Sequence, residues 1–202
     1  MSVLSDITIC NEREKGNIVI SPFDAKNLSN SSYDISLGKY YYVEEFIEGV
    51  VNPWNEEHIK RLWKGPFKAE CREGFDKSDK VIIIPPKKTI LAHTREFIGG
   101  VNNITTMMKT RSSIGRVSIA ICKCAGWGDV GFFNRYTMEI TNFSEQNTIG
   151  LIVGKRVGQI IFIRTDECYR TYNGKYQNKD DLESVIKEWK PEMMLPRLYL
   201  DN

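Results

Sequence analysis

The residues best suited to chemistry lie in one short stretch of the chain. Arg111-Ser-Ser-Ile-Gly-Arg116 is followed by Ala125-Gly-Trp-Gly-Asp129 and then by Glu139. Guanidinium groups match phosphate oxygens in a bidentate way, and serines supply hydroxyl and backbone donors. Carboxylates can position water and transfer protons. Together these residues predict a nucleotide site, whereas the arginine-serine turn alone fits a solvated surface turn at least as well.

Each of the two carboxylates has a functional and a structural interpretation. In Ala125 to Gly131, three glycines allow close backbone approach, so the loop can hold a ribose and base while Asp129 takes a hydroxyl or a water. The alternative is a hairpin turn that Asp129 caps. Glu139 alternates with Met138 and Ile140 and therefore lies on the opposite face of a strand. A cleft-facing Glu139 is a candidate general base, and the alternative is an exposed strand carboxylate.

Composition limits the class of protein and its partners. The 202 residues, 41% of them apolar, suffice for one domain with a real core. A formal net charge of +2 argues against broad electrostatic capture of nucleic acid or of an anionic membrane, and we expect neither as a partner. The chain has no run of about twenty apolar residues and no leader-like start over Met1 to Cys10, so we expect a soluble, cytoplasmic protein.

Periodicity predicts a mostly β protein with a few short helices. Several short strands separated by Gly, Pro and Asn turns are typical of a sandwich or barrel. We expect them at Ser31–Gly38 (closed by Gly38 and Lys39), Val81–Ile84, Thr89–His93, Met107–Lys109, Val117–Cys124, Tyr136–Phe143 and Gly158–Arg164. Helices are expected at Ser5–Gly16, with Ser5 as N-cap, at Glu56–Trp63 and at Asp180–Trp189. We predict one domain over 1–202, with 44–80 as an insertion or lid and 165–202 as a C-terminal arm and helix.

Six segments resemble, in the right order, the dCTP deaminase branch of the dUTPase-like superfamily. They are Leu4-Ser-Asp-Ile7, Gly16-Asn-Ile-Val-Ile-Ser-Pro-Phe23, Ser32-Tyr-Asp-Ile-Ser-Leu-Gly38, Thr89-Ile-Leu-Ala92 ahead of the Arg-Ser-Ser turn, Val157-Gly-Gln-Ile-Ile-Phe162 and Tyr172-Asn-Gly-Lys-Tyr-Gln177. The resemblance covers nearly the whole chain. It implies a distorted β-barrel, related to a jelly roll, that forms a homotrimer with active sites at subunit interfaces.

The activity implied by the resemblance is zinc-independent hydrolysis of dCTP to dUTP and ammonia. It makes Glu139 the general base, with Ser112 and the Ala125 carbonyl positioning the water and Arg116 orienting Glu139 and stabilising charge. It implies that magnesium binds only through the substrate triphosphate. The residues implied to contact substrate are Arg111, Ser113, Trp127, Asp129, Gln159, Tyr172, Lys175, Tyr176 and Lys179.

The absence of zinc is also expected from the residues themselves. Zinc deaminases carry His-x-Glu followed by Pro-Cys-x-x-Cys. In this chain His58 precedes Ile-Lys and His93 precedes Thr-Arg, and the five cysteines include no CxxC pair. We therefore expect no protein-held metal and expect a carboxylate to activate the water.

Departures from the family pattern keep two alternatives open. Gly128 replaces the usual Ile or Val before Asp129 and is expected to loosen that segment, while Asn134 replaces a usual Gly and is expected to keep a left-handed turn. Lys179 stands where Gln is common. The first alternative is a bifunctional dCTP deaminase/dUTPase, or a dUTPase-type pyrophosphatase, yielding dUMP and pyrophosphate. Glu139 argues against a plain dUTPase, which has an apolar residue there. The second alternative is a non-catalytic nucleotide-binding relative.

Overall fold

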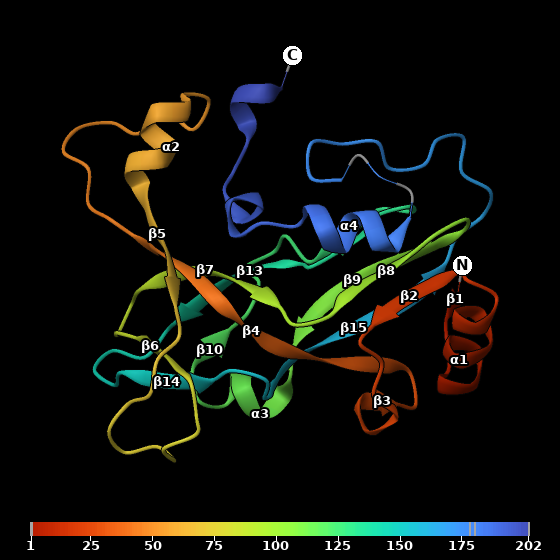
Figure 1. Cartoon of the computed structure of the whole chain (residues 1–202), viewed down its shortest axis with the longest axis horizontal. Helices are drawn as coiled ribbons and strands as arrows, with labels where there is room; N and C mark the ends of the chain where they lie inside the picture. The colour runs from red at the N-terminus through yellow and green to blue at the C-terminus, as the bar shows by residue number, and fades with distance from the viewer. Residues whose placement is uncertain (1, 178, 180, 202) are drawn as a thin grey trace.

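Strands dominate the computed structural model, which describes residues 2–177, 179 and 181–201 (Figure 1). Among these residues, the largest sheet has ten strands in the order β10-β13-β7-β4-β15-β9-β11, with β1 paired to β15 and with β3 and β5 paired to β4. Their bounds are β1 Ser2–Val3, β3 Leu28–Ser29, β4 Ser32–Glu44, β5 Trp63–Lys68, β7 Thr89–Thr94, β9 Ile104–Thr110, β10 Ile119–Ala120, β11 Trp127–Gly128, β13 Thr137–Asn142 and β15 Arg156–Arg164.

Two smaller sheets and a set of short helices complete the fold. One small sheet has the order β12-β8-β2 and the other pairs β14 with β6. These strands are β2 Ile18–Ser21, β6 Val81–Ile84, β8 Phe97–Gly100, β12 Phe133–Asn134 and β14 Ile149–Ile152. The helices are α1 Asp6–Glu14, α2 Glu56–Leu62, α3 Ser112–Gly115 and α4 Leu182–Glu188, with 3-10 turns η1 Ala25–Asn27, η2 Pro191–Met194 and η3 Leu198–Leu200.

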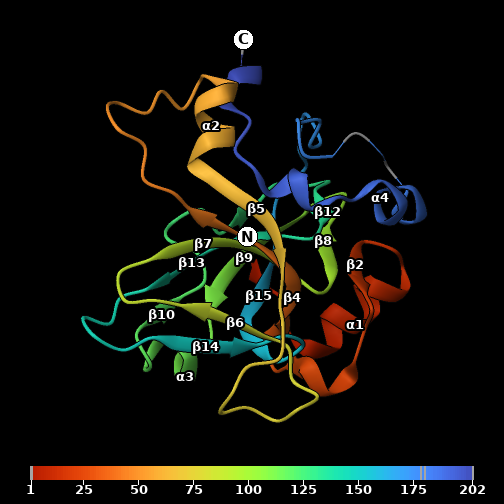
Figure 2. The ribbon, with the colours of Figure 1, turned by 60° about the vertical axis from the view of Figure 1, so that its left-hand side comes forward.

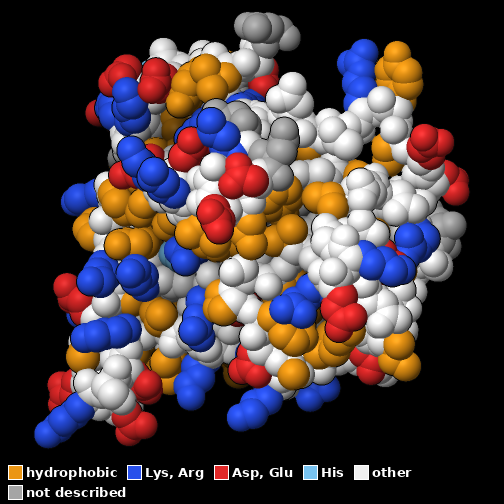
Figure 3. Space-filling view, turned by 45° about the vertical axis from the view of Figure 1, so that its right-hand side comes forward, with side chains coloured by type: hydrophobic (Ala, Val, Ile, Leu, Met, Phe, Trp, Pro, Cys, Tyr) orange, Lys and Arg blue, Asp and Glu red, His pale blue; other side chains and the backbone are white. Residues whose placement is uncertain are grey.

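The helices lie around a curled, incomplete barrel. Figures 1 and 2 place α2, α4 and the C-terminal segment on one side of the sheets, and α3 with β6 and β14 on the opposite side. Basic and acidic side chains are intermixed on the face drawn in Figure 3. Within the described residues, none of the helices combines the length and apolar character that a membrane crossing requires. The mostly β fold with a few short helices, predicted from the sequence, is confirmed.

Apolar side chains from facing strands fill the interior. The largest fully buried ones include, from β4, β6, β7, β8, β9 and β15, the side chains Tyr33, Ile35, Leu37, Ile82, Ile84, Ile90, Ile98, Ile104, Met108 and Phe162. Burial of such side chains supplies most of the driving force for folding, because each removes apolar surface from water. The core also fixes the strands that carry the candidate site, since Met138 and Ile140 of β13 are fully buried in it.

β4 is longer than expected because Gly38 does not end it. The strand continues to Glu44, and its pairing with β7 shifts register between Leu37 and Tyr41. A Cβ at position 38 would lie 2.1 Å from the His93 ring, so the glycine admits the buried imidazole rather than a turn. The half-buried pattern is also wrong: Ser32, Asp34 and Ser36, on the face opposite the core, are buried too.

Several other local predictions need correction. Val117–Cys124 forms only the two-residue strand β10, because Val117 and Ser118 instead donate backbone hydrogen bonds to the turn of α3. Segment 44–80 contains α2 as expected but also the unpredicted strand β5, paired with β4. Strands β8, β11, β12 and β14 were not predicted. Helix α4 begins at Leu182, and the predicted start, Asp180, lies outside the described residues. Whether 44–80 acts as an insertion or lid stays a prediction.

Candidate active site

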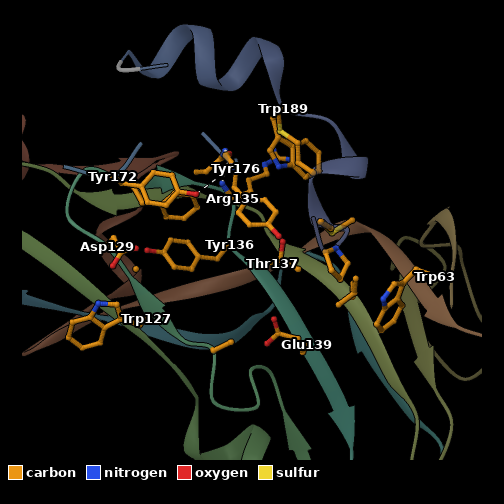
Figure 4. Close-up of a pocket in the computed structure, with 18 residues that line it drawn as sticks. Trp63, Trp127, Asp129, Arg135, Tyr136, Thr137, Glu139, Tyr172, Tyr176 and Trp189 are labelled. Carbon is orange, nitrogen blue, oxygen red and sulfur yellow. Dashed lines mark hydrogen bonds between the residues drawn. The ribbon is translucent and has the colours of Figure 1, made fainter. Parts of the chain in front are cut away.

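A cavity of about 410 Å³ lies between β13, the 125–137 loop and the C-terminal segment (Figure 4). It contains both carboxylates singled out in the sequence, Asp129 and Glu139. Its lining residues are Trp63, Leu91, Ala125, Trp127, Gly128, Asp129, Phe132, Asn134, Arg135, Tyr136, Thr137, Glu139, Tyr172, Tyr176, Trp189, Met193, Met194 and Pro196. The cavity size and its mix of apolar walls with a few polar groups are typical of a small-molecule site.

Glu139 lies on the face of β13 opposite Met138 and Ile140, as their alternation predicted, and this face lines the cavity. It pairs across the strands with Leu91 of β7, another lining residue. Its Oε2 atom is buried and has no hydrogen-bond partner among the described residues. Burial raises the pKa of Glu139, and hydrogen bonds from backbone groups offset part of this rise. A carboxylate with a raised pKa and a free oxygen facing a cavity can accept and return a proton.

Asp129 follows directly after β11, which is held by pairing with β9. Gly128 does not loosen this segment, contrary to expectation, because it is buried and its carbonyl accepts a 2.7 Å hydrogen bond from Thr105 Oγ1. The left-handed residue in the turn is Gly131, with φ 95°, rather than Asn134. Asn134 instead lies in β12, where its side chain donates to the Tyr176 carbonyl at 3.1 Å. The local structure around Asp129 is therefore well anchored.

The arm from Tyr172 to Gln177 docks on the Asp129 loop. The Tyr172 N–H donates to the Val130 carbonyl at 2.8 Å. The Gln177 side chain bridges two backbone groups of the loop, donating to Gly131 and accepting from Phe133. The rings of Tyr136, Phe132 and Tyr172 meet edge to face, with centroids 5.2 and 5.1 Å apart. Arm and loop thus form one wall of the cavity, with Tyr172 and Tyr176 facing it.

The C-terminal segment supplies an opposite wall that sequence reasoning missed. Trp189 packs on the ring of His93, with ring centroids 4.6 Å apart. The guanidinium of Arg135 lies 4.5 Å from the centroid of the Trp189 ring. Arg135 also stacks on Phe97, and its Nε atom is buried without a partner in the described part of the chain. Trp63 reaches the cavity from β5. Among these residues, only Trp189 could have been expected in a packed position from the sequence, because of its helical spacing with other apolar residues.

The predicted residues separate into two groups within one chain. Ala125, Trp127, Asp129, Glu139, Tyr172 and Tyr176 line the cavity. Ser112, Ser113 and Arg116 do not, because they belong to α3 and its C-cap on the far side of the sheets. Arg111 pairs with Asp34 at 3.2 Å, and Gln159 lies opposite Asp34 in the β4–β15 ladder. A single chain therefore does not assemble the complete predicted set.

The two lysines of the arm region also point elsewhere. Lys175 donates to the Arg197 carbonyl at 3.0 Å and pairs with the Asp201 carboxylate. Lys179 pairs with Glu188 of α4 at 3.5 Å. Neither lysine lines the cavity, so their predicted contacts with substrate require these pairs to open.

Comparison with known proteins identifies the family. A family model described as dCTP deaminase-like matches residues 3–165. The chain belongs to this family. The match includes α3, Asp129 and Glu139 and ends before the arm. A crystal structure of 2′-deoxycytidine 5′-triphosphate deaminase from Agrobacterium tumefaciens shares the fold, with TM-score 0.57 and 16% identity over 79% of this chain. The chain spans about half, 47%, of that crystallised chain.

Curated relatives in the dCTP deaminase-like family correct the predicted reaction. "dCTP deaminase, dUMP-forming" from Aquifex aeolicus is 34% identical over 178 residues, 88% of this chain and 90% of the relative. A protein of the same name from Methanobrevibacter smithii is 32% identical over 95% of this chain and 94% of its own length. These names specify dUMP as the product, so the prediction that dUTP is the end product is wrong. The bifunctional alternative agrees with them.

Proposed function

We propose that the protein converts dCTP to dUMP and releases ammonia and pyrophosphate from one site. One dCTP and two waters give one dUMP, one ammonia and one pyrophosphate. The observation that carries the proposal is the cavity shared by Asp129 and Glu139, in which a buried Glu139 oxygen has no partner among the described residues. The dUMP-forming relatives support the same outcome.

Glu139 performs the deamination in this proposal. Its carboxylate accepts a proton from the water that attacks C4 of cytosine and passes it to N3. It then takes the second proton from the C4 hydroxyl and passes it to the amino group, which leaves as ammonia while the C4 carbonyl forms. Burial raises the pKa of Glu139, which lets the group hold the proton between these transfers. Positioned acid-base help of this kind contributes roughly a hundredfold to ten-thousandfold in rate. The Ala125 carbonyl and Ser112 hold the water, and Arg116 stabilises the charge that develops.

Asp129 serves the sugar and the second hydrolysis. It binds the 3′-hydroxyl beside Trp127 and so positions the α-phosphate for attack by water. Arg111, Ser113, Gln159, Lys175, Tyr176 and Lys179 contact the triphosphate, with Tyr172 in the wall beside it. Bound only through the substrate triphosphate, magnesium would supply neutralisation of the phosphate charge. The firm anchoring of Gly128 and Asp129 supports this step, because hydrolysis needs a fixed sugar.

A homotrimer completes the site. The α3 residues Ser112, Ser113 and Arg116 lie outside the cavity of their own chain, so a second copy must bring them to Glu139. Such a contact joins two different surfaces of the chain, and three copies can close it into a ring. Each of the three cavities then takes its general base, Glu139, from one subunit and Arg116 from the next.

Product analysis tests the reaction. Purified protein is incubated with dCTP and magnesium, and nucleotides, ammonia and pyrophosphate are quantified. We expect equal amounts of dUMP, ammonia and pyrophosphate, with loss of all three in Glu139→Gln. The matched control is Glu145→Gln, which removes an exposed carboxylate and should retain full activity. Free dUTP as the end product would refute pyrophosphate release, and unchanged dCTP would refute the whole proposal.

Subunit complementation tests the assembly separately. Arg116→Ala and Glu139→Gln subunits carrying different tags are co-expressed, and mixed oligomers are isolated by tandem purification. Each variant alone should be inactive. If each cavity takes Glu139 and Arg116 from different subunits, one of the three cavities in every mixed trimer is intact, about one third. Activity near one third of wild type is expected, and inactive mixed oligomers contradict the shared site.

A further inference from the structure

Gly128 and Tyr136 both line the cavity, and the Tyr136 hydroxyl packs closely against the Gly128 backbone. A Cβ added at position 128 would lie 1.8 Å from the Tyr136 hydroxyl oxygen and 2.3 Å from Thr106 Oγ1. No residue larger than glycine can therefore occupy position 128 while Tyr136 keeps its place. The Tyr136 hydroxyl therefore takes the space that a side chain at position 128 would need. Figure 4 shows the Tyr136 hydroxyl pointing towards Asp129.

The Tyr136 hydroxyl is tied to the strand that ends at Asp129. It shares a hydrogen bond with Thr106 Oγ1 of β9, directly opposite Gly128 in the β9–β11 ladder. The neighbouring Thr105 hydroxyl donates to the Gly128 carbonyl at 2.7 Å. Tyr136 is buried, and burial raises its pKa so that the phenol stays protonated. The ring, the threonine hydroxyls and the Gly128 backbone thus form one buried polar cluster.

The same residue is also fixed to the strand that carries Glu139. Tyr136 immediately precedes β13, and its N–H donates to Thr94 Oγ1 of β7 at 2.9 Å. Its ring meets Phe132, which follows Asp129 in the loop, at 5.2 Å. One side chain therefore connects the backbone beside Asp129 with the backbone beside Glu139.

We propose that Tyr136 is a positioning residue that sets the separation between Asp129 and Glu139. The inference rests on the proposed function, in which Asp129 holds the sugar and Glu139 acts on the base of one nucleotide. Both ends must be in register for the reaction, because a displacement of about 1 Å in a bound reactant costs on the order of a hundredfold in rate. Tyr136 acts through Thr106 and Gly128 and does not itself react.

The first test compares substrates that differ only at the sugar. Kinetic constants are measured with dCTP and with 2′,3′-dideoxycytidine triphosphate, which lacks the 3′-hydroxyl that Asp129 holds. In wild type we expect dCTP to be preferred at least tenfold in kcat/KM, the value of a hydrogen bond to a charged group. In Tyr136→Phe this preference should fall at least threefold, because Asp129 is less well placed while the ring remains.

A buried tyrosine outside the cavity provides the control. Tyr33 accepts a hydrogen bond from the Asp24 N–H at 2.9 Å and is fully buried, so Tyr33→Phe loses a similar bond. It should keep the wild-type preference for dCTP over the dideoxy substrate. A purely structural role for Tyr136 predicts that Tyr136→Phe and Tyr33→Phe behave alike, with both substrates affected equally. That result overturns the proposal.

A second test changes the side-chain volumes at positions 128 and 136. Gly128→Val alone should reduce kcat/KM for dCTP at least tenfold, because its side chain collides with the Tyr136 hydroxyl. The double variant Gly128→Val/Tyr136→Val removes the collision with the hydroxyl, while the close approach to Thr106 Oγ1 remains, so it should recover only part of the activity that Gly128→Val loses. Failure of the double variant to exceed Gly128→Val, with both folded by circular dichroism, overturns the complementarity. Wild type that leaves dCTP unchanged would instead refute the proposed function.

Discussion

The carboxylate of Asp34 holds the guanidinium of Arg111, with Asp34 Oδ2 lying 3.2 Å from Arg111 Nε. Arg156, a residue of β15, contacts the same oxygen, with its Nη1 atom 3.1 Å from Asp34 Oδ2. Desolvation raises the pKa of Asp34, and the two guanidinium groups offset part of that rise. Asp34 is buried, whereas Arg111 keeps about a third of its side chain exposed, 32%. The pair therefore presents a fixed guanidinium edge to solvent, as a phosphate site requires.

Replacing the buried partner should weaken triphosphate binding. We expect Asp34→Asn to raise the KM for dCTP about tenfold with a smaller change in kcat, since a hydrogen bond to a charged group contributes roughly 1.5–3 kcal/mol. Steady-state kinetics measure this effect. Arg156→Gln is the control, because it removes a contact to the same carboxylate but leaves Arg111 held. Equal KM values in the two variants contradict a specific role for Arg111.

Asp201 forms an ion pair with the ammonium group of Lys175, which is predicted to contact the substrate phosphates. Lys175 pairs with Asp201 and also donates to the Arg197 carbonyl. A triphosphate must displace Asp201, so Asp201→Asn should lower the KM for dCTP by about two- to fivefold, the range for a partly exposed ion pair. The effect should shrink as salt rises. Asp76→Asn, in an exposed loop, should leave the KM unchanged; a matching decrease there would indicate only a change in net charge.

Burial of His93 predicts acid sensitivity of the fold. Its Nε2 atom accepts from the Tyr40 N–H at 3.2 Å, and its Nδ1 donates to the Thr94 carbonyl at 2.8 Å. Desolvation lowers the pKa of His93 from 6.5 to about 4. The unfolded state therefore binds a proton that the folded state excludes. Stability is full above pH 6.5 and falls by up to about 3 kcal/mol as pH decreases towards 4.

Urea unfolding at pH 7 and pH 4.5 measures this contribution. The loss between the two pH values should be about 2–3 kcal/mol smaller in His93→Gln than in wild type, because groups common to both proteins cancel. His58 is exposed, so His58→Gln should show the wild-type loss. An identical pH dependence in His93→Gln and wild type would exclude the histidine as the cause.

Local periodicity was enough to predict the strands that alternate cleanly. The sequence around Glu139 places Met138 and Ile140 on one face of a strand and Glu139 on the other. In the structure the two apolar residues are in the core, and Glu139 lines the cavity, one of the two alternatives that the sequence left open. β5 has no such pattern, because most of it is exposed and it contains Pro66. β8 contains two glycines, and a Cβ at Gly99 would lie 2.0 Å from the Phe132 carbonyl oxygen. The close approach of Phe132, a residue distant in the sequence, therefore requires glycine in this strand, although glycines locally suggest a loop.

The candidate site was predictable by residue type but not by arrangement. The family motifs identified Asp129, Glu139 and the arm, yet no pattern along the chain places Asp34 against Arg111. The expectation for Gly128 was wrong for the same reason: its space is taken by Tyr136, a contact that only the fold reveals. The wall formed by Trp63 and Trp189 also depends on the C-terminal segment folding back over the sheets.

One Glu139 oxygen has no partner among the described residues, which predicts that the candidate site reduces stability. Burial raises the pKa of Glu139, so at pH 7 the folded state holds a charge that the unfolded state solvates better. In the Arg116→Ala background, which removes the guanidinium that a second copy brings to Glu139 in the proposed trimer, Glu139→Gln should therefore stabilise the protein by about 1 kcal/mol at pH 7, as expected where function opposes stability. The gain should disappear below pH 4.5, where the carboxyl is protonated in both states.

Urea unfolding of Arg116→Ala and Arg116→Ala/Glu139→Gln across this pH range measures the effect. In the same background Glu145→Gln removes a carboxylate that is 80% exposed and should change stability little at any pH. A double variant Arg116→Ala/Glu139→Gln less stable than Arg116→Ala at pH 7 would mean that another group in the assembled protein satisfies the carboxylate and would contradict the prediction.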